Sequence, residues 1–180
     1  MILLRIRLLL AGFCCTIRAM GQIRSRETRA SRPQLDDTSK AIIEQLQQDG
    51  RRAYATIGKA VGLSEAAVRQ RVQKLIESGV VQIVAVTDPQ QIGFARQVMI
   101  GVNVEGNLDE VASDLAEIPE LVYVVITAGS FDLLCEAVVI DDEHLLELIN
   151  DRIRKLPGVR RTETFMYLKL KKQTYNWGIA

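Results

Sequence analysis

The sequence predicts an α+β protein in which a small helical domain precedes a domain with a repeated strand–helix–strand pattern. Three observations lead to this class. Residues 53–80 read as a helix, a tight turn and a second helix. Residues 95–172 alternate between strand-like and helix-like segments in two similar halves. The chain has 180 residues, 48% of them hydrophobic and 25% charged, which is typical of one or two small folded domains.

The helical stretch begins with a short amphipathic segment and a turn. Ile57, Ala60 and Val61 are spaced three and four residues apart, so they share one face of a helix. Gly62 follows, and glycine readily adopts the left-handed conformation that ends a helix. The hydroxyl of Ser64 can then accept a hydrogen bond from an early backbone N–H group of a second helix.

The second helix is predicted to bury one face and to present a polar face to solvent. Val68, Val72 and Leu75 recur at spacings of four and three, and Gly79 ends the helix. The remaining positions carry Arg, Gln and Lys, which hydrogen-bond base edges and phosphates in a major groove. This pattern predicts a DNA-binding helix-turn-helix, although the same charges can simply solvate an amphipathic helix. The residues expected to contact double-stranded DNA, with the first two at phosphates, are Arg51, Arg52, Ser64, Ala66, Arg69, Gln70, Arg71, Gln73 and Lys74.

A preceding helix completes the first domain. The polar run at residues 36–39 can cap a helix that carries Ile42, Ile43 and Leu46. We therefore expect residues 35–79 to form a helix-turn-helix domain of winged-helix-like type. Because a core of this size is marginal by itself, we expect the rest of the chain to support it.

The next segment predicts a connection between two domains. Residues 80–86 are rich in β-branched side chains and predict a strand, which the Asp-Pro pair at 88–89 would end. We expect residues 80–94 to form a β linker. Residues 173–180 are expected to be a C-terminal tail.

Charge is distributed unevenly around a formal net charge of +1. Residues 1–34 carry seven arginines and one glutamate, and residues 35–87 carry seven basic and six acidic residues, so the remainder is acidic by six charges. An acidic C-terminal half would be repelled by DNA, which places DNA contact in the N-terminal half. Residues 1–34 are expected to be an extension, either disordered or preceding a native start at Met20. Its apolar run is too short to span a membrane.

The second domain is predicted from an internal repeat. We expect strands at residues 98–104, 121–127, 131–139 and 159–170, with helices at 107–118 and 141–156. A shift of 38 residues aligns the apolar positions of the two halves: Leu108 with Leu146, Val111 with Ile149, and Leu115 with Ile153. Two such halves form a ferredoxin-like βαββαβ sheet with both helices on one face. The other face, left apolar and uncovered, predicts a homodimer.

The turn between the two halves is a candidate small-molecule site. Gly129 permits positive φ, and successive backbone N–H groups in such a turn can bind an anion. Asp132 could hold an ammonium group beside it, so the turn could accept both charged ends of an amino acid. An ordinary hairpin turn is the alternative. The expected effector-binding residues are Thr127, Ala128, Gly129, Ser130, Phe131 and Asp132.

Little in the sequence favours an enzyme. The single histidine, His144, lies among acidic residues at a helix start and is expected to be solvated. No phosphate-binding glycine loop, metal-ligand cluster or nucleophile motif is recognisable, so no cofactor is expected. Three cysteines, at positions 14, 15 and 135, do not form a disulfide or zinc pattern, and a reducing cytoplasm is expected, with no membrane partner.

Taken together, these residues resemble the Lrp/AsnC ("feast/famine") family of regulators. The resemblance runs from Leu35 to about Lys172 and includes residues 49–51, 57–64, the Val68–Val81 pattern, Gly93, and Gly129 with Asp132. It implies an amino acid effector held between neighbouring dimers near the 129–132 turn, and dimers that assemble into tetramers, octamers or larger rings. The function expected is therefore sequence-specific regulation of amino-acid metabolism. The alternatives are an amino-acid sensor without DNA binding, and a decarboxylase of the same fold.

Overall fold

The computed structural model describes residues 35–175, 178 and 179. They fall into two compact units, one that ends at Ala85 and also takes in the chain from Thr174, and one that spans Val86–Gln173. The extension predicted at residues 1–34 lies outside the described residues. No helix of the described chain is both long and apolar enough to cross a membrane.

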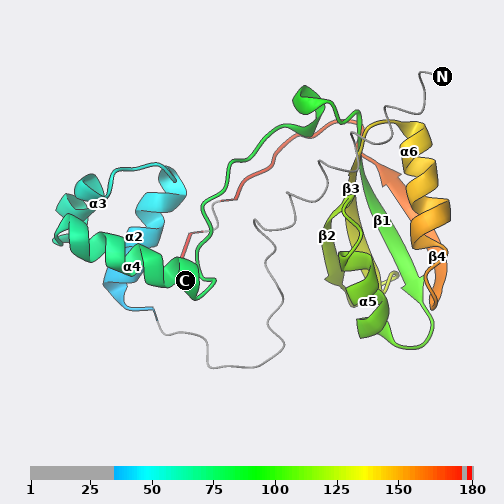
Figure 1. Cartoon of the computed structure of the whole chain (residues 1–180), viewed down its shortest axis with the longest axis horizontal. Helices are drawn as coiled ribbons and strands as arrows, with labels where there is room; N and C mark the ends of the chain where they lie inside the picture. The colour runs from blue at the N-terminus through cyan, green and yellow to red at the C-terminus, as the bar shows by residue number, and fades with distance from the viewer. Residues whose placement is uncertain (1–34, 176–177, 180) are drawn as a thin grey trace, which may run out of the picture. The chain divides into compact units, whose positions relative to one another are not determined.

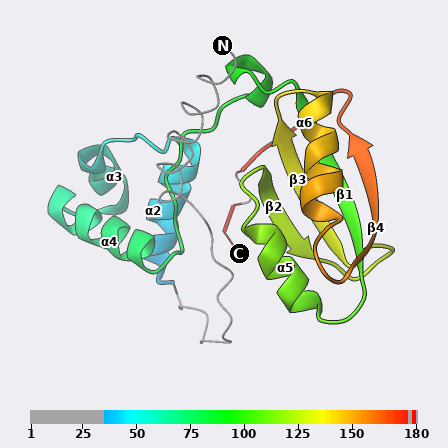
Figure 2. The ribbon, with the colours of Figure 1, turned by 45° about the vertical axis from the view of Figure 1, so that its right-hand side comes forward.

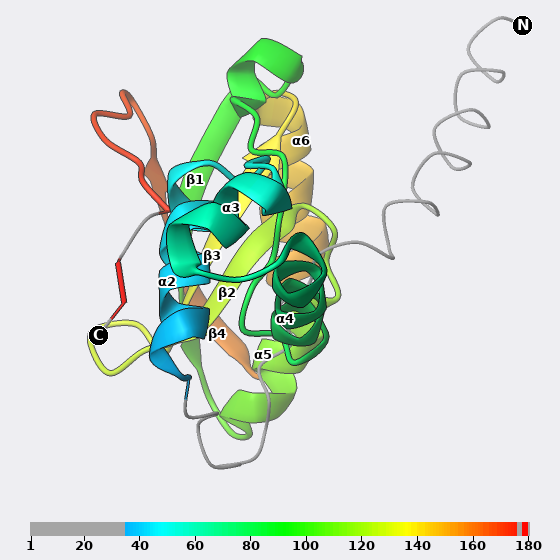
Figure 3. The same cartoon turned by 90° about the vertical axis from the view of Figure 1, so that its left-hand side faces the viewer.

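The first unit is a bundle of three helices (Figure 1). These are α2 (Asp37–Gln48), α3 (Tyr54–Val61) and α4 (Glu65–Glu77). Figure 3 shows α4 nearly end-on, with α2 and α3 beside it. Their shared core is made by Ile42, Leu46, Ile57, Val68 and Val72. The predicted buried face of α4 is thereby confirmed, because Leu75 is also buried.

The predicted turn chemistry of this unit is confirmed. Asp36 caps α2 by accepting the N–H group of Ser39 at 2.8 Å. Gly62 has φ of 71° and ends α3 in the left-handed conformation. Ser64 caps α4, with its hydroxyl accepting the N–H group of Ala67 at 3.2 Å. Gly62 and Ser64 bound the short turn that joins α3 to α4.

The strand predicted at residues 80–86 is wrong. The chain from 81 to 88 forms no strand, and a short 3₁₀ helix, η2 (Pro89–Ile92), follows it. The side chains of Ile83, Val84 and Val86 are 45%, 62% and 60% exposed. β-branched residues favour an extended backbone, but a strand also needs a hydrogen-bonded neighbour. Residues 35–85 therefore contain no β wing, and the winged-helix-like description does not apply to this part of the chain.

The second unit has the predicted ferredoxin-like order of elements (Figure 2). Its strands form one antiparallel sheet in the order β2-β3-β1-β4. The helices α5 and α6 lie on the same face of this sheet. In chain order the elements are β1 (Arg96–Val104), α5 (Leu108–Ala116), β2 (Leu121–Ile126), β3 (Leu133–Val139), α6 (Asp142–Glu147), the π-helical turn η3 (Leu148–Ile153) and β4 (Val159–Met166).

The π-helical turn η3 changes how the two halves of the repeat align. A π turn holds one extra residue, so side chains after it rotate relative to those before it. Leu145 and Leu148 are buried in the second half, whereas Leu146 is 60% exposed. At the first residue of η3 the buried positions of the two halves are 37 residues apart, in Val111 and Leu148. At its last residue they are 38 apart, in Leu115 and Ile153, which are both fully buried. The predicted pairing of Leu108 with Leu146 is therefore wrong, whereas Ile149, the predicted partner of Val111, is partly buried against the core.

The sheet face away from the helices is partly apolar and uncovered. We call it the open sheet face, and its central rows comprise Met99, Tyr123, Val125, Leu134, Glu136 and Phe165. Tyr123 is 52% exposed and Phe165 43%. The opposite face supplies Ile100, Leu133 and Cys135, among others, to the core beneath α5 and α6. The predicted bare face is therefore present in the single chain.

Candidate functional site

The outward surface of α4 carries four of the nine residues predicted to contact DNA. Ala66, Gln70, Gln73 and Lys74 are exposed there. The Gln73 amide donates to Glu77 at 2.9 Å, four residues along the helix. We call Ala66, Gln70, Gln73 and Lys74 the α4 outer face. Its amides and amine project from a capped helix whose other side is anchored in the core, which is the arrangement that a groove-reading helix requires.

Arg69 lies at the edge of the α4 outer face. Its guanidinium is 2.7 Å from Glu65, one turn earlier, and 5.2 Å above the ring of Tyr54 in α3. The ion pair is exposed and Tyr54 is half-buried, so the two contacts restrain the side chain but stabilise the fold little. Arg69 therefore remains available to a ligand, with its stem directed towards α3.

Arg71 has a structural role that the sequence prediction missed. Its Nη1 donates to Asp36 at 2.7 Å and to the Ser39 hydroxyl at 3.2 Å, and so joins α4 to the start of α2. Hydrogen bonds from Ser39, and then the Arg71 guanidinium, lower the pKa of the Asp36 carboxyl to about 2. The signal in the sequence was the capping run at 36–39, which offers a carboxylate to any cation on a neighbouring helix.

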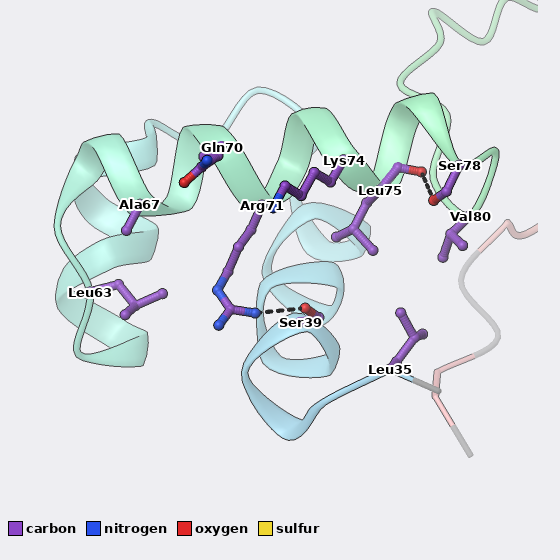
Figure 4. A pocket seen from close by; sticks show the side chains of 10 residues that line it. All are labelled: Leu35, Ser39, Leu63, Ala67, Gln70, Arg71, Lys74, Leu75, Ser78 and Val80. Carbon is purple, nitrogen blue, oxygen red and sulfur yellow. Dashed lines mark hydrogen bonds between the residues drawn. The ribbon is translucent and has the colours of Figure 1, made fainter. Parts of the chain in front are cut away.

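A groove runs along α4, from Leu63 and Ala67 near the start of the helix to Val80 beyond its end (Figure 4). It has a volume of about 550 Å³. Its floor is apolar, and Gln70, Arg71 and Lys74 form its polar rim. The complete lining is Leu35, Ser39, Leu63, Ala67, Gln70, Arg71, Lys74, Leu75, Ser78 and Val80. The groove adjoins the α4 outer face through Gln70 and Lys74.

The two arginines of the turn between α2 and α3 differ in their contacts. Arg52 donates to the side-chain oxygens of Gln45 and, at 3.3 Å, of Gln48, and so fastens the end of α2. Arg51 is exposed, and its backbone N–H group donates to Asp49 at 2.9 Å. Arg51 is therefore the freer of the two to meet a phosphate.

The turn predicted to bind an effector is braced against β1. The Asn103 amide donates to the Ser130 carbonyl at 2.9 Å, and the Val104 N–H group donates to the Asp132 carboxylate at 2.8 Å. Within the turn, the Thr127 N–H group donates to the Asp132 carbonyl at 2.9 Å and its hydroxyl to the Phe131 carbonyl. One carboxylate oxygen of Asp132 is thus engaged by the fold, which the sequence could not show.

Gly129 does not use the backbone freedom expected of it. Its φ is not positive, and a Cβ atom added to it would meet nothing within 4 Å. Neither backbone strain nor crowding inside one chain requires a glycine here. Ala128, Gly129 and Ser130 are all exposed, so this side of the turn is open to a ligand or to another subunit.

An aromatic pair beside the turn was also missed by the sequence analysis. A Cβ atom at Gly101 would lie 2.7 Å from the Phe131 ring, so the glycine in the middle of β1 makes room for that ring. Phe165 packs edge-on against Phe131, with 5.9 Å between ring centroids. The signal was a glycine inside a β-branched strand, which often marks a close approach.

His144 is not the solvated side chain that we expected. Only 29% of it is exposed, and its Nε2 lies 3.3 Å from the Glu120 carboxylate, which Arg152 also approaches at 3.7 Å. Among the described residues, no group of His, Cys, Asp and Glu could hold a metal ion. Cys135 is buried, and burial raises the pKa of its thiol to about 12, so it is a poor nucleophile.

Two family models match this chain in succession. Residues 35–76 match the AsnC-type helix-turn-helix domain, which includes α2, α3 and nearly all of α4. Residues 94–180 match a C-terminal dimeric alpha+beta barrel domain.

Individual proteins are similar to this chain over most of its length. The HTH-type transcriptional regulator FL11 of Pyrococcus horikoshii is 39% identical over 142 residues, covering 78% of this chain and 93% of FL11. A transcriptional regulator of Neisseria meningitidis, solved in complex with L-Met, has a TM-score of 0.69 at 25% identity, covering 81% of this chain and 96% of its own. The leucine response regulatory protein of Mycobacterium tuberculosis has a TM-score of 0.70 at 27% identity, covering 77% and 96%.

Proposed function

This chain belongs to the Lrp/AsnC family of helix-turn-helix transcriptional regulators, and we propose that it reads operator DNA with the α4 outer face under the control of an amino acid. The observation that carries the proposal is the geometry of α4. One side of the helix is locked into the core by Val68 and Val72, while Gln70 and Gln73 stand exposed on the other. Such amides can hydrogen-bond adenine edges in a major groove.

The residues around α4 divide into base-reading and phosphate-binding roles in this proposal. Ala66, Gln70 and Gln73 face the bases, and the small side chain of Ala66 allows close approach. Arg51 and Lys74 meet phosphates on either side, and the capped start of α4 at Ser64 favours a phosphate through its dipole. Arg69 can reach either partner. Arg52 acts mainly by fastening the end of α2, and Arg71 by joining α4 to the start of α2, since their guanidinium groups donate to side chains within the unit.

The amino acid is proposed to bind at the exposed side of the turn Thr127–Asp132. Support comes from the open space at Gly129 and from a structural relative that was solved with L-Met. The second carboxylate oxygen of Asp132 would take the ammonium group, while backbone N–H groups near Gly129 would take the carboxylate. Thr127, Ser130 and Phe131 would hold the turn in the shape that presents these groups. Binding that favours one packing of subunits would change the spacing of the helices offered to DNA.

Assembly and cellular setting complete the proposal. The open sheet face and the match to a dimeric domain support a homodimer as the basic unit. We infer that dimers associate further into tetramers or octamers, because the effector turn is open at a position where a neighbouring dimer could close it. A DNA-reading role leads us to infer a cytoplasmic protein. Because the relatives are transcriptional regulators, we infer a regulator and not an enzyme.

The DNA arm of the proposal is tested by a gel shift on the DNA upstream of the protein's own coding sequence. Replacing Gln70 by Ala should weaken specific binding by about 1–3 kcal/mol, because the variant cannot form a bidentate hydrogen bond to a base. Gln90→Ala is the matched control, since Gln90 is an exposed glutamine of η2. Equal operator affinity for the two variants would remove Gln70 from the base-reading set.

The effector arm is tested by calorimetry with single amino acids. Gly129→Thr should abolish or weaken the binding heat while leaving thermal stability unchanged, because the added side chain meets no atom of its own chain. Ser113→Thr, an exposed substitution in α5, serves as the control. Normal amino acid binding by Gly129→Thr would rule out the turn as the site.

A further inference from the structure

Positive charge is concentrated in one stretch of the otherwise acidic second unit. Residues 88–180 carry nine Lys and Arg against fifteen Asp and Glu. Five of the nine basic residues fall between positions 152 and 161, and that stretch contains no acidic residue. The expected repulsion of DNA by the whole C-terminal half therefore does not extend to this part of the surface. A local cluster, and not the average charge, decides what such a surface attracts.

Three of these basic side chains line one concavity where η3 passes into β4. Its volume is about 380 Å³. It is lined by Arg154, Val159, Arg160, Arg161 and Thr162. The pairing of β1 with β4 shifts between Asn103 and Val104, so β4 holds one extra residue there. A β-bulge breaks the strict alternation of side chains, and it allows two consecutive arginines to line the same hollow.

Arg154 is held in position without being neutralised by its partners. Its Nε donates to the Thr162 hydroxyl at 2.9 Å, and its Nη1 donates to the Asn150 side-chain oxygen at 2.9 Å. Both acceptors are uncharged. The guanidinium is therefore pre-oriented from two elements and keeps its full positive charge for a ligand. Pre-orientation lowers the entropy cost of binding an anion.

Arg160 and Arg161 have acidic partners that a stronger anion can displace. Arg160 lies 2.9 Å from Glu105, and Arg161 lies 3.1 Å from Glu163. The side chains in the Arg160 pair are 70% and 73% exposed. Exposed ion pairs of this kind contribute little to stability. A phosphate group offers more acceptor oxygens in the geometry that arginine forks match.

We propose that Arg154, Arg160 and Arg161 form a phosphate-binding site, and that the phosphate is supplied by the backbone of the DNA bound by α4. The choice of DNA as the source rests on the proposed function. The polar, open character of the hollow suits a sequence-independent backbone contact, because phosphates carry no base information. The same three guanidinium groups would also accept a free phosphate, and the experiment separates the two sources.

The DNA source is tested with the full-length protein by measuring duplex affinity over a range of salt concentrations. The double variant Arg154→Gln/Arg160→Gln should lower the slope of log affinity against log salt by about 0.9 for each phosphate that is no longer neutralised. The control variant Lys155→Gln/Lys171→Gln also removes two positive charges, but from residues that do not line the hollow. It should leave the slope nearly unchanged. Thermal unfolding of both variants checks that they are folded. An equal drop in slope for the two variants would overturn the site.

The free phosphate source is tested by thermal shift with inorganic phosphate on the same proteins. A rise in Tm of the wild type that is absent in Arg154→Gln/Arg160→Gln, with an unchanged salt slope, supports the site and rejects DNA as its source. No phosphate shift and no change of slope would overturn the proposal altogether. Failure of the proposed function would be seen differently, because the wild-type protein would then show no preference for its operator over a random duplex, whatever the arginines do.

Discussion

At the scale of single residues, Gly101 links the sheet to the turn at residues 127–132. The Phe131 ring occupies the place where a side chain at position 101 would stand, only 2.7 Å from the expected Cβ. Gly101→Ala should destabilise the protein by about 1–3 kcal/mol, as overpacking does, and should displace the turn. Denaturant unfolding measures the loss. The double variant Gly101→Ala/Phe131→Leu should recover much of it, whereas additive losses would show that the two residues do not interact.

Asp36 makes the helical unit sensitive to acid. Its folded pKa of about 2 lies below the ordinary value of 3.8, because Ser39 and Arg71 stabilise the charged form. A lowered carboxyl pKa contributes stability that is complete above the unfolded pKa and is lost as pH falls through the folded one. We expect the stability gap between wild type and Asp36→Asn to be widest at neutral pH and to shrink between about pH 4 and pH 2. Urea unfolding across that range checks it, and a constant gap would contradict it.

At the scale of elements, the π turn η3 predicts an asymmetry between the two helices of the repeat. Deleting the exposed Asp151 should convert η3 into regular helix and keep Leu148 and Ile153 on the buried face. Deleting the exposed Ser113 from α5 should rotate Leu115 by about 100° away from the core, since α5 has no extra residue to lose. We expect the first deletion to keep most of the Tm and the second to unfold the unit. Comparable Tm values would contradict this account.

The elements that the sequence predicted are those specified by local chemistry. Caps at Asp36 and Ser64 and the left-handed Gly62 depend on a few neighbouring residues, and all three were predicted. A strand at 80–86 would need a hydrogen-bonded partner elsewhere in the chain, and the 38-residue alignment is shifted by the one extra residue of η3. The periodicity of apolar residues indicates neither. The internal contacts of Arg71 and Asp132 could not be predicted for the same reason, because each joins segments that lie about thirty residues apart. The DNA and effector residues remain predictions.

At the scale of the whole molecule, the open sheet face should hold two copies together. Leu134→Lys places a charge in the middle of this face, on the central strand β3, and should yield a monomer. Leu146→Lys places the same charge on the outer side of α6, at a residue that is already 60% exposed, and should leave the dimer intact. Sedimentation velocity distinguishes the two. Loss of the dimer in Leu134→Lys should lower operator affinity about 100-fold or more, because one protein can no longer engage two half-sites together. A dimeric Leu134→Lys protein would contradict the assignment.

The buried thiol of Cys135 can report transient opening of the second unit. The sulfur sits beneath two helices on a central strand, where a proton leaves it only at a pKa of about 12. A thiol reagent can reach the sulfur only when the sheet separates from its helices. The rate of labelling at Cys135 therefore measures how often this opening occurs. With Cys14 and Cys15 changed to serine, the rate of labelling at Cys135 reports how often the second unit opens, and an amino acid that binds and stabilises this unit should slow the labelling.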